Sequence, residues 1–329
     1  MYESITEHGA VGDGEASETE AIQDTIDACA DSGGGTAYVP PGDYVTGTLE
    51  LRSHVTLHLA PGATLYGSPD LEEYRSADAP TSALVVAVDE EDVAVTGRGT
   101  IHGNGTEFMD MDTVIDPNDD PAVLEFEHEA RQGEDFLDHG DGIADGPVDF
   151  LDRPGRMFLF YRCENVLVEG ITIRESPNWT LHLLGCDEVD VHGIDMLNEI
   201  LVPNSDGINP ENCRNVHVSN CTVYTGDDAI CPKASGSYDV EPGLENLTVT
   251  NCTLVSRSSA IKFGSSTGND MRDCTFSNIV IRESNRGLGI QHRDGGDIEN
   301  VLFEDIVIET RLHTGNWWGQ AEPIYVTSI

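Results

Sequence analysis

Six stretches of alternating apolar and polar residues recur through the second half of the chain, each with a polar corner in its middle. They begin at Asn165, Glu188, Asn215, Asn246, Asp273 and Asn300, so the steps between them are similar in length. Alternation with a period of two is typical of strands that bury one face, and a repeat of this length is typical of a solenoid. The pattern predicts an all-β fold, a single-stranded parallel β-helix with one copy per coil.

A second periodic row lies between these copies. Isoleucine follows a small residue at four places, Ile208, Ile230, Ile261 and Ile290. We interpret this row as another sheet of the same solenoid, with isoleucine pointing inward and the residues just before it reaching solvent on one lateral face. Shorter β-like runs extend the pattern toward the N-terminus, at 36–39, 55–59 and 93–96.

Residues 18–31 show helical periodicity instead. Ile22, Ile26 and Cys29 fall on one face, and a glycine run that starts at Gly33 ends the helix. The open end of a solenoid exposes sheet edges, so we expect this helix to cap the first coil. A single domain over residues 1–329 then accounts for the chain.

Two segments depart from the repeat. Residues 106–153 are acidic, rich in glycine and aperiodic, which predicts a surface insertion, either one wall of a cleft or a solvated loop. Residues 323–329 form a β-like run with no cap after it. Because an uncapped coil exposes a sheet edge, this end indicates a C-terminally shortened chain or an end covered by a partner.

The negative charge of the chain disfavours some classes of binding partner. The formal net charge is −43, and Lys233 and Lys262 are the only lysines in the sequence. Nucleic acids and anionic membrane surfaces are therefore poor partners, and such self-repulsion suggests adaptation to high salt, where charges are screened. No apolar run is long enough to cross a membrane, and no signal peptide is visible, so a cytoplasmic location is expected. A misassigned or processed start would instead allow a secreted protein.

The eight cysteines are better explained by the repeat than by disulfides, because five of them fall on two repeat positions. Cys163, Cys186 and Cys213 each precede a valine by three residues, while Cys221 and Cys252 share a second equivalent position. Stacked, buried thiols explain this distribution better than disulfides. No Cys-x-x-Cys pair is present, so we expect neither a metal site nor a cofactor.

Asp206 and the pair Asp227–Asp228 carry the candidate chemistry. Asp206 and Asp228 each stand two residues before an isoleucine of the row. If the interval between them forms one coil, the two carboxylates stack roughly 4.8 Å apart, with Asp227 beside them. Clustered carboxylates push one another's pKa values apart, and paired carboxylates are what acid/base cleavage of a glycosidic bond requires. Aspartates at ordinary turns are the alternative, but their gathering on one face favours a catalytic site.

The sequence resembles glycoside hydrolase family 28, the polygalacturonase family of right-handed parallel β-helices, over nearly its whole length. The matching motifs include His8-Gly-Ala-Val-Gly-Asp-Gly, Ser176-Pro-Asn-Trp-Thr-Leu-His, Asn204-Ser-Asp-Gly and Gly226-Asp-Asp. The resemblance implies inverting hydrolysis of pectic poly- or oligosaccharides, with Asp227 as the general acid and with Asp206 and Asp228 activating water.

The same resemblance assigns further residues. It implies that Asn204 orients the site and that Lys233 is the lysine that commonly follows the aspartate pair. Trp179 and His182 precede the first motif by one coil, where they either line the cleft or pack inside the protein.

Two departures from the family pattern concern substrate recognition. Ser259 stands where the family carries a histidine, and Gly-Ile-Gln, ending at Gln291, stands where it carries the Arg-Ile-Lys that grips a galacturonate carboxylate. We interpret the interval from Lys262 to Gln291 as one ladder step. We predict that Lys262, with His292 or Arg293, replaces that grip, a surface lysine being the alternative.

Three functions follow from these observations. The first is a hydrolase of galacturonate-containing or related pectic glycans that works at high salt. The second is a calcium-dependent pectate-type lyase, because clustered aspartates can bind Ca²⁺. The third is a solenoid that binds glycans without cutting them, because the histidine and the Arg-Ile-Lys are missing.

Overall fold

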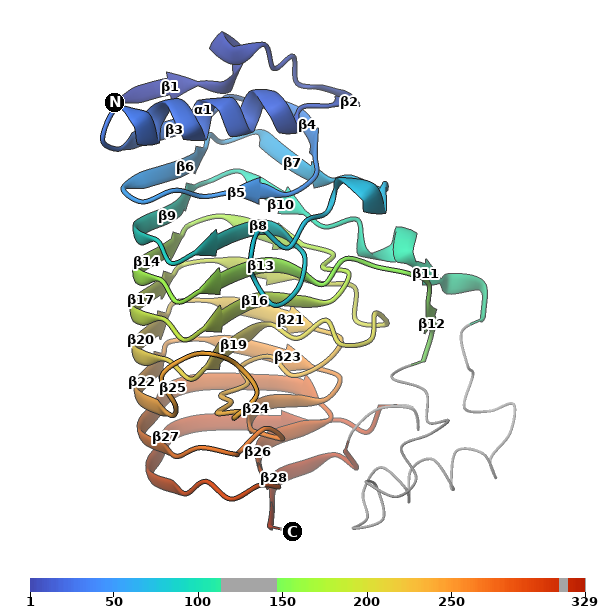
Figure 1. The fold of residues 1–329 in the computed structure, drawn as a ribbon. Coiled ribbons are helices and arrows are strands. Elements are labelled where there is room, and N and C mark those ends of the chain that lie inside the picture. The colour runs from blue at the N-terminus through green and yellow to red at the C-terminus, as the bar shows by residue number, and fades with distance from the viewer. Residues whose placement is uncertain (114–146, 314–318, 329) are drawn as a thin grey trace.

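The computed structural model describes residues 1–113, 147–313 and 319–328, and it shows a column of stacked coils built from parallel strands (Figure 1). The coils wind in the right-handed sense that connections between parallel strands nearly always take. The predicted right-handed parallel β-helix is confirmed. The N-terminus lies at one end of the column and the C-terminus at the other.

Three ladders of parallel strands run along the described part of the column. The first ladder consists of β1 (Tyr2–Ser4), β3 (Gly35–Val39), β6 (Val55–Leu59), β9 (Glu91–Gly97), β14 (Glu164–Glu169), β17 (Asp187–His192), β20 (Arg214–Ser219), β22 (Leu244–Thr250), β25 (Met271–Ser284) and β27 (Ile298–Thr310). The second ladder consists of β2 (Asp13–Ser17), β4 (Gly42–Thr46), β7 (Ala63–Gly67), β10 (Thr100–His102), β15 (Thr172–Arg174), β18 (Asp195–Leu197), β21 (Thr222–Thr225) and β23 (Thr253–Ser256), and it joins the long strand β25.

The third ladder positions the candidate site. Its strands are β5 (Leu49–Glu50), β8 (Ala83–Val88), β13 (Arg156–Tyr161), β16 (Trp179–Leu184), β19 (Ile208–Glu211), β24 (Ser259–Phe263), β26 (Arg286–His292) and β28 (Glu322–Ser328). Single parallel bridges through Ile230, to Ile208 on one side and Ile261 on the other, connect β19 to β24. The ladder is therefore continuous across the coils that hold the three aspartates.

The spacing of the six sequence copies is confirmed by the strand register of the first ladder. Residues that face one another on neighbouring coils are, in order, Glu164, Asp187, Arg214, Glu245, Arg272 and Glu299. Each of them immediately precedes the first residue of a copy, so one copy corresponds to one coil throughout. Insertions between coils are absorbed in the connecting turns, because the stacked valines and leucines must stay in register to remain buried.

The polar corners of the copies owe their composition to backbone conformation. The first residue of every copy has a left-handed φ, 55° at Asn165, 53° at Glu188, 52° at Asn215, 60° at Asn246, 57° at Asp273 and 54° at Asn300. The corner five residues later is also left-handed and is Gly170, Gly193, Asn220, Asn251, Asn278 or Asp305. Glycine, asparagine and aspartate tolerate this conformation best, which explains why these residues recur at the corners.

Apolar side chains fill the column, and a helix covers its first coil. The inward residues of the three ladders form one continuous core, and Ile22, Ile26 and Cys29 of α1 (Thr19–Asp31) belong to it. The helix predicted for 18–31 lies across the N-terminal end of the column (Figure 1). All eight cysteines are buried with free thiols, and the backbone N–H of Cys186 donates to the Cys213 sulfur at 3.4 Å, as stacking predicts.

One detail of the predicted register is wrong. Ile261 faces Leu288, and Ile290 faces Phe263, so Lys262 faces Gly289 rather than Gln291. Residues 288 and 290 are both apolar and both point toward the same side of the strand, so alternation alone does not distinguish the two registers. Gln291 therefore does not stand next to Lys262.

The ends of the predicted insertion are visible, but most of it lies outside the described residues. β11 (Met109–Asp110) and β12 (Asp149–Phe150) form a short antiparallel pair. β11 lies between the 3₁₀ turns η3 (Gly105–Phe108) and η4 (Met111–Thr113), and β12 precedes the third-ladder strand β13. Two further 3₁₀ turns are η1 (Ile5–His8) and η2 (Leu71–Glu73). Within the ranges that the structure covers, no helix has the length and apolar character needed to cross a membrane.

Candidate active site

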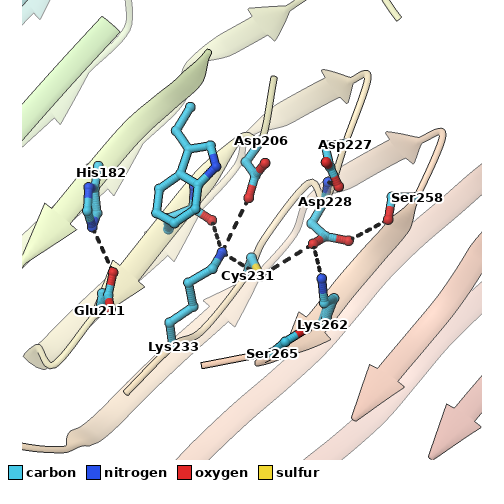
Figure 2. Close-up of polar contacts among 12 residues, drawn as sticks. His182, Asp206, Glu211, Asp227, Asp228, Cys231, Lys233, Ser258, Lys262 and Ser265 are labelled. Atoms are coloured by element: carbon cyan, nitrogen blue, oxygen red, sulfur yellow. Dashed lines mark hydrogen bonds and ion pairs between the residues drawn. The ribbon is translucent and has the colours of Figure 1, made fainter. Parts of the chain in front are cut away.

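Two of the three candidate aspartates, Asp206 and Asp228, lie in one row of residues along the third ladder. Each of Trp179, Asp206, Asp228 and Ser259 stands two residues before a member of the paired series Leu181, Ile208, Ile230 and Ile261. Arg156 faces Trp179 at one end of the row, and Arg286 faces Ser259 at the other. We call these six residues the aspartate row. Asp206 and Asp228 are one coil apart, as the sequence predicts, and Asp227 adjoins them (Figure 2).

Lys233 is bound to Asp206. Its ammonium lies 3.3 Å from Asp206 Oδ2, 3.0 Å from Asn209 Oδ1 and 2.9 Å from Cys231 Sγ (Figure 2). An ammonium has three N–H donors, so these contacts use all of them. Lys233 is only 5% exposed. Lys233 therefore neutralises and holds Asp206, and these contacts leave no N–H donor for a further group. A role of Lys233 in binding substrate stays a prediction.

Lys262 is bound to Asp228 in the same manner. Its Nζ lies 2.7 Å from Asp228 Oδ2, while Ser258 Oγ donates to Oδ1 of the same carboxylate at 2.9 Å. The backbone N–H of Ser259 adds a third donor to Oδ1 at 3.1 Å. Ser259, which occupies the family's histidine position, thus supports Asp228 through its backbone, and its own side chain is fully buried.

Asp227 forms no ion pair with any described residue. Its Oδ1 accepts the backbone N–H of Asp228 at 2.9 Å. Two hydroxyl groups, Thr225 Oγ1 and Ser256 Oγ, donate to its backbone carbonyl at 2.6 Å each and fix the turn that carries it. Asp227 is 4% exposed, so its carboxyl group has lost most of its hydration without gaining a cation.

The three carboxyl groups consequently differ in ionisation. Burial, reinforced by Asp206 and Asp228, raises the pKa of Asp227 well above its usual range. Burial opposes the ionisation of Asp228 too, but the ammonium groups of Lys262 and Lys233 outweigh it and hold the pKa of Asp228 below its usual value. Burial raises the pKa of Asp206, and the ammonium of Lys233 opposes that rise. Of the three carboxyl groups, Asp227 has its pKa raised furthest, so it is the best suited to hold a proton.

The same cluster brings together three groups of the kind that bind metal ions. Oxygens of Asp206 and Asp228 and the sulfur of Cys231 lie within 4.8 Å of one another. However, ammonium groups stand at 2.7 Å from Asp228, 2.9 Å from Cys231 and 3.3 Å from Asp206, so cations of the protein already occupy the space a metal would take. Burial also raises the pKa of the Cys231 thiol to about 12, which disfavours the thiolate that binds metals. The donor set does not fit a resident metal ion.

The residues of the predicted grip, Lys262, His292 and Arg293, each contact other parts of the protein, and the grip itself stays a prediction. Lys262 is bound to Asp228, and His292 bonds to Ser328 Oγ at 2.9 Å and to Gly296 O at 2.6 Å. Gln291 accepts a hydrogen bond from Ser265 Oγ at 3.2 Å, and the backbone of Arg293 bonds to Thr267 Oγ1 at 2.9 Å. The strand register places Gly289, rather than Gln291, opposite Lys262.

The remaining predicted residues lie on the N-terminal side of the aspartates. Asn204 has a left-handed φ of 54°, and its Oδ1 accepts from Arg153 Nη2 at 2.7 Å, so it is bound to Arg153. His182 is 1% exposed and Nε2 lies 3.0 Å from Glu211 Oε2, which agrees with the packing alternative. Burial lowers the pKa of His182 to about 4, so its ring is neutral. The partly exposed Trp179 ring lies 4.1 Å from Arg156 Cζ and 4.2 Å from Lys233 Nζ.

Sequence reasoning missed four residues that hold this network together. They are Asn209, Cys231, Ser258 and the His182 partner Glu211. Cys231 has no distinctive signal in the sequence, because Cys29 and Cys274 also fall outside the two stacked cysteine positions of the repeat. Asn209 and Glu211 follow Ile208 at the alternation expected of outward residues on the third ladder, so their place was predictable although their partners were not.

Several known proteins are similar to this chain in sequence and in fold. Over 98% of its length the chain is 27% identical to a probable polygalacturonase of Vitis vinifera, and over 92% it is 27% identical to an exo-poly-alpha-D-galacturonosidase of Dickeya chrysanthemi. It spans 64% and 54% of the lengths of these two relatives. The crystal structure of a hyperthermoactive exopolygalacturonase from Thermotoga maritima superposes with a TM-score of 0.70 at 26% identity, covering 93% of this chain and 76% of that one.

Family models match both halves of the column. The model described as rhamnogalacturonase A/epimerase, pectate lyase-like, matches residues 2–77, which include α1 and the first coils. The model described as glycosyl hydrolases family 28 matches residues 149–313, half of the chain. The second match spans the coils that carry all three aspartates and both lysines, and the chain accordingly belongs to glycosyl hydrolases family 28.

Proposed function

We propose that this protein hydrolyses glycosidic bonds of galacturonate-containing or related pectic glycans with inversion of configuration. Asp227 carries the assignment, because it is the member of the cluster that has no lysine partner and keeps its proton. It serves as the general acid that protonates the leaving oxygen, the role that a raised pKa suits. The pectic substrate is supported by the printed functions of the relatives, which are polygalacturonases and a galacturonosidase.

Asp206 and Asp228 activate the attacking water in this proposal. Their nearest oxygens lie within 4.8 Å of each other, close enough for both to accept hydrogen bonds from one water molecule. Each is held by a lysine that favours its charged form, so the pair can withdraw a proton while Asp227 donates one. Direct attack of this water on the anomeric carbon inverts its configuration.

We further propose that the enzyme works at high salt. The net charge of −43 repels an anionic glycan as well as the chain itself, and at about 1 M salt the screening length falls to roughly 3 Å. Under those conditions short-range contacts in the cleft decide binding.

The decisive experiment measures reducing ends released from a panel of pectic oligosaccharides at molar salt. Wild type is expected to release them, and Asp227→Asn is expected to lose about 10²–10⁴-fold in kcat. NMR of the fresh product distinguishes inversion from retention. An unsaturated, ultraviolet-absorbing product that disappears with chelator would identify a lyase instead. Binding without any new reducing end would identify a glycan-binding solenoid.

A further inference from the structure

Arg156 differs from the two lysines beside the aspartates in having no acidic partner. It begins β13 and faces Trp179 across the ladder. Its Nε donates to Nδ1 of His182 at 3.3 Å, and its Nη1 donates to the carbonyl oxygen of Gly155 at 2.6 Å. Both acceptors are neutral, since burial keeps the His182 ring uncharged. Among the described residues, no carboxylate lies within ion-pair distance of this guanidinium.

The nearest acids cannot turn toward Arg156 because each has a partner. Asp206 is bound by Lys233 at 3.3 Å, and Glu211 is bound by His182 at 3.0 Å. At the other end of the aspartate row, Arg286 is already paired with Glu322 at 3.2 Å. A partly desolvated guanidinium without a counterion is costly in any protein, and it is unexpected in a chain with a net charge of −43.

The position of Arg156 is fixed from two sides. Its guanidinium lies 4.1 Å from the centroid of the Trp179 ring, a cation–π contact, and the hydrogen bond to His182 continues to Glu211. Trp179 stands next to Asp206 in the aspartate row, so Arg156 is two coils, roughly 10 Å, from Asp206. Arg156 remains partly exposed, so a ligand on this face of the column can reach it.

We propose that Arg156 binds the carboxylate of a uronate residue on the N-terminal side of the aspartate row. The guanidinium, aligned by Trp179 and His182, supplies the counterion contact that Lys262 does not supply, because Lys262 is bound to Asp228. The substrate at this subsite is therefore an acidic sugar, and neutral or esterified sugars are disfavoured there. This assignment rests on the proposed glycan hydrolysis and adds the residue that selects the substrate.

The test compares wild type, Arg156→Gln and Arg156→Lys on two matched substrates. One is a galacturonate oligosaccharide, and the other is the same oligosaccharide with its carboxyl groups methyl-esterified. Arg156→Gln should raise KM for the acidic substrate by about 10- to 100-fold, the usual effect of losing a charged hydrogen bond. KM for the ester and kcat for both substrates should change less than about twofold. Arg156→Lys should recover part of the loss, because lysine keeps the charge but not the planar fork.

Arg174→Gln is the matched control. Arg174 ends β15 on the same coil, is exposed, and belongs to the second ladder rather than to the third. It should leave both KM values unchanged. An equal rise of KM on both substrates in Arg156→Gln, or no rise on either, would overturn the assignment.

A binding measurement separates this inference from the proposed reaction. Calorimetric titration of the acidic oligosaccharide into Asp227→Asn, with and without Arg156→Gln, reports the subsite without turnover. Loss of affinity in the double variant supports the role of Arg156 even if wild type releases no reducing ends. Unchanged affinity in the double variant, together with normal hydrolysis by wild type, contradicts the role of Arg156 while leaving the proposed function intact.

Discussion

At the scale of single residues, the candidate site contains three carboxyl groups and only two ammonium groups to pair with them. Lys233 bonds to Asp206, Lys262 bonds to Asp228, and Asp227 remains without a cation (Figure 2). Two anions are therefore neutralised where they stand, and the third carboxyl group is held as the acid by their negative charge and by burial. A division of roles among chemically identical side chains arises here from the placement of their neighbours.

Lys262 is predicted to set the pH range of activity. Its ammonium lowers the pKa of Asp228, so Lys262→Met should raise that pKa and move the acid limb of kcat/KM to higher pH. The basic limb should move in the same direction, because Lys262 also lowers the pKa of Asp227. Lys262→Arg should restore the original limbs. If Lys262→Met lowers kcat without moving either limb, the lysine has a purely structural role.

Asp227 is predicted to weaken the fold while serving the reaction. Because its pKa is raised, Asp227 keeps its proton in the folded protein at pH values where the unfolded chain releases it, above about pH 3.9. The contribution of Asp227 to the free energy of unfolding therefore falls as the pH rises. Asp227→Asn cannot ionise. The melting temperature of this variant should therefore exceed that of wild type by a margin that grows between about pH 4.5 and 7. The exposed substitution Asp305→Asn, at a corner that suits asparagine, should show no such growth.

At the scale of elements, the corners of the coils determine which residues repeat. Asn251 has a φ of 56°, and its amide donates to Asn220 Oδ1 at 3.3 Å while its own oxygen accepts from Asn278. One residue type thus satisfies both the left-handed backbone and the ladder between coils. Asparagine does this at three consecutive corners of the first ladder's copies, where glycine serves earlier in the chain.

Asn251→Ala and Asn251→Gly separate these two contributions. Alanine loses the side-chain ladder and strains the left-handed backbone, so the free energy of unfolding should fall by about 1–3 kcal/mol. Glycine loses the ladder alone, so its cost should be smaller by roughly the 1 kcal/mol of backbone strain. Urea denaturation of the three proteins measures both differences. Equal losses in the two variants would mean that the backbone conformation contributes nothing.

The same scale shows what alternation predicts and where it stops. The coil spacing was predictable, because buried valines tolerate no slip of one residue. The register near Ile290 was not, because Leu288 and Ile290 are both apolar residues on one side of β26. The aspartate cluster was predictable, because Asp206 and Asp228 each stand two residues before an isoleucine of the repeated row. Its lysine partners were not, because a lysine side chain has four rotatable bonds, and Lys233 reaches Asp206 on the preceding coil.

At the scale of the whole molecule, the chain carries a large excess of negative charge. The sequence holds 60 acidic residues against 17 basic ones, and its two lysines are both in the site. Exposed acids that repel one another destabilise the compact state, and mobile cations relieve this repulsion within the screening length. Buried pairs are screened much less, so added salt should affect the lysine–aspartate pairs of the site less than it affects the repulsion between exposed acids.

Salt is predicted to stabilise this fold by screening. Between 0.1 M and 1 M NaCl the screening length falls from about 10 Å to about 3 Å, so the melting temperature should rise steeply and then level off. The rise should exceed the roughly 2–4 °C that 1 kcal/mol produces in somewhat smaller domains. Sucrose, which acts by exclusion from the surface, is the uncharged comparison. A melting temperature independent of NaCl would show that self-repulsion is unimportant.

The burial of both lysines has a practical consequence for attaching the protein to a support. Their side chains are 6% and 12% exposed, and each ammonium is engaged by a carboxylate. Reagents that couple to amines should therefore leave both lysines unmodified in the folded protein, and attachment through lysine should succeed only after unfolding.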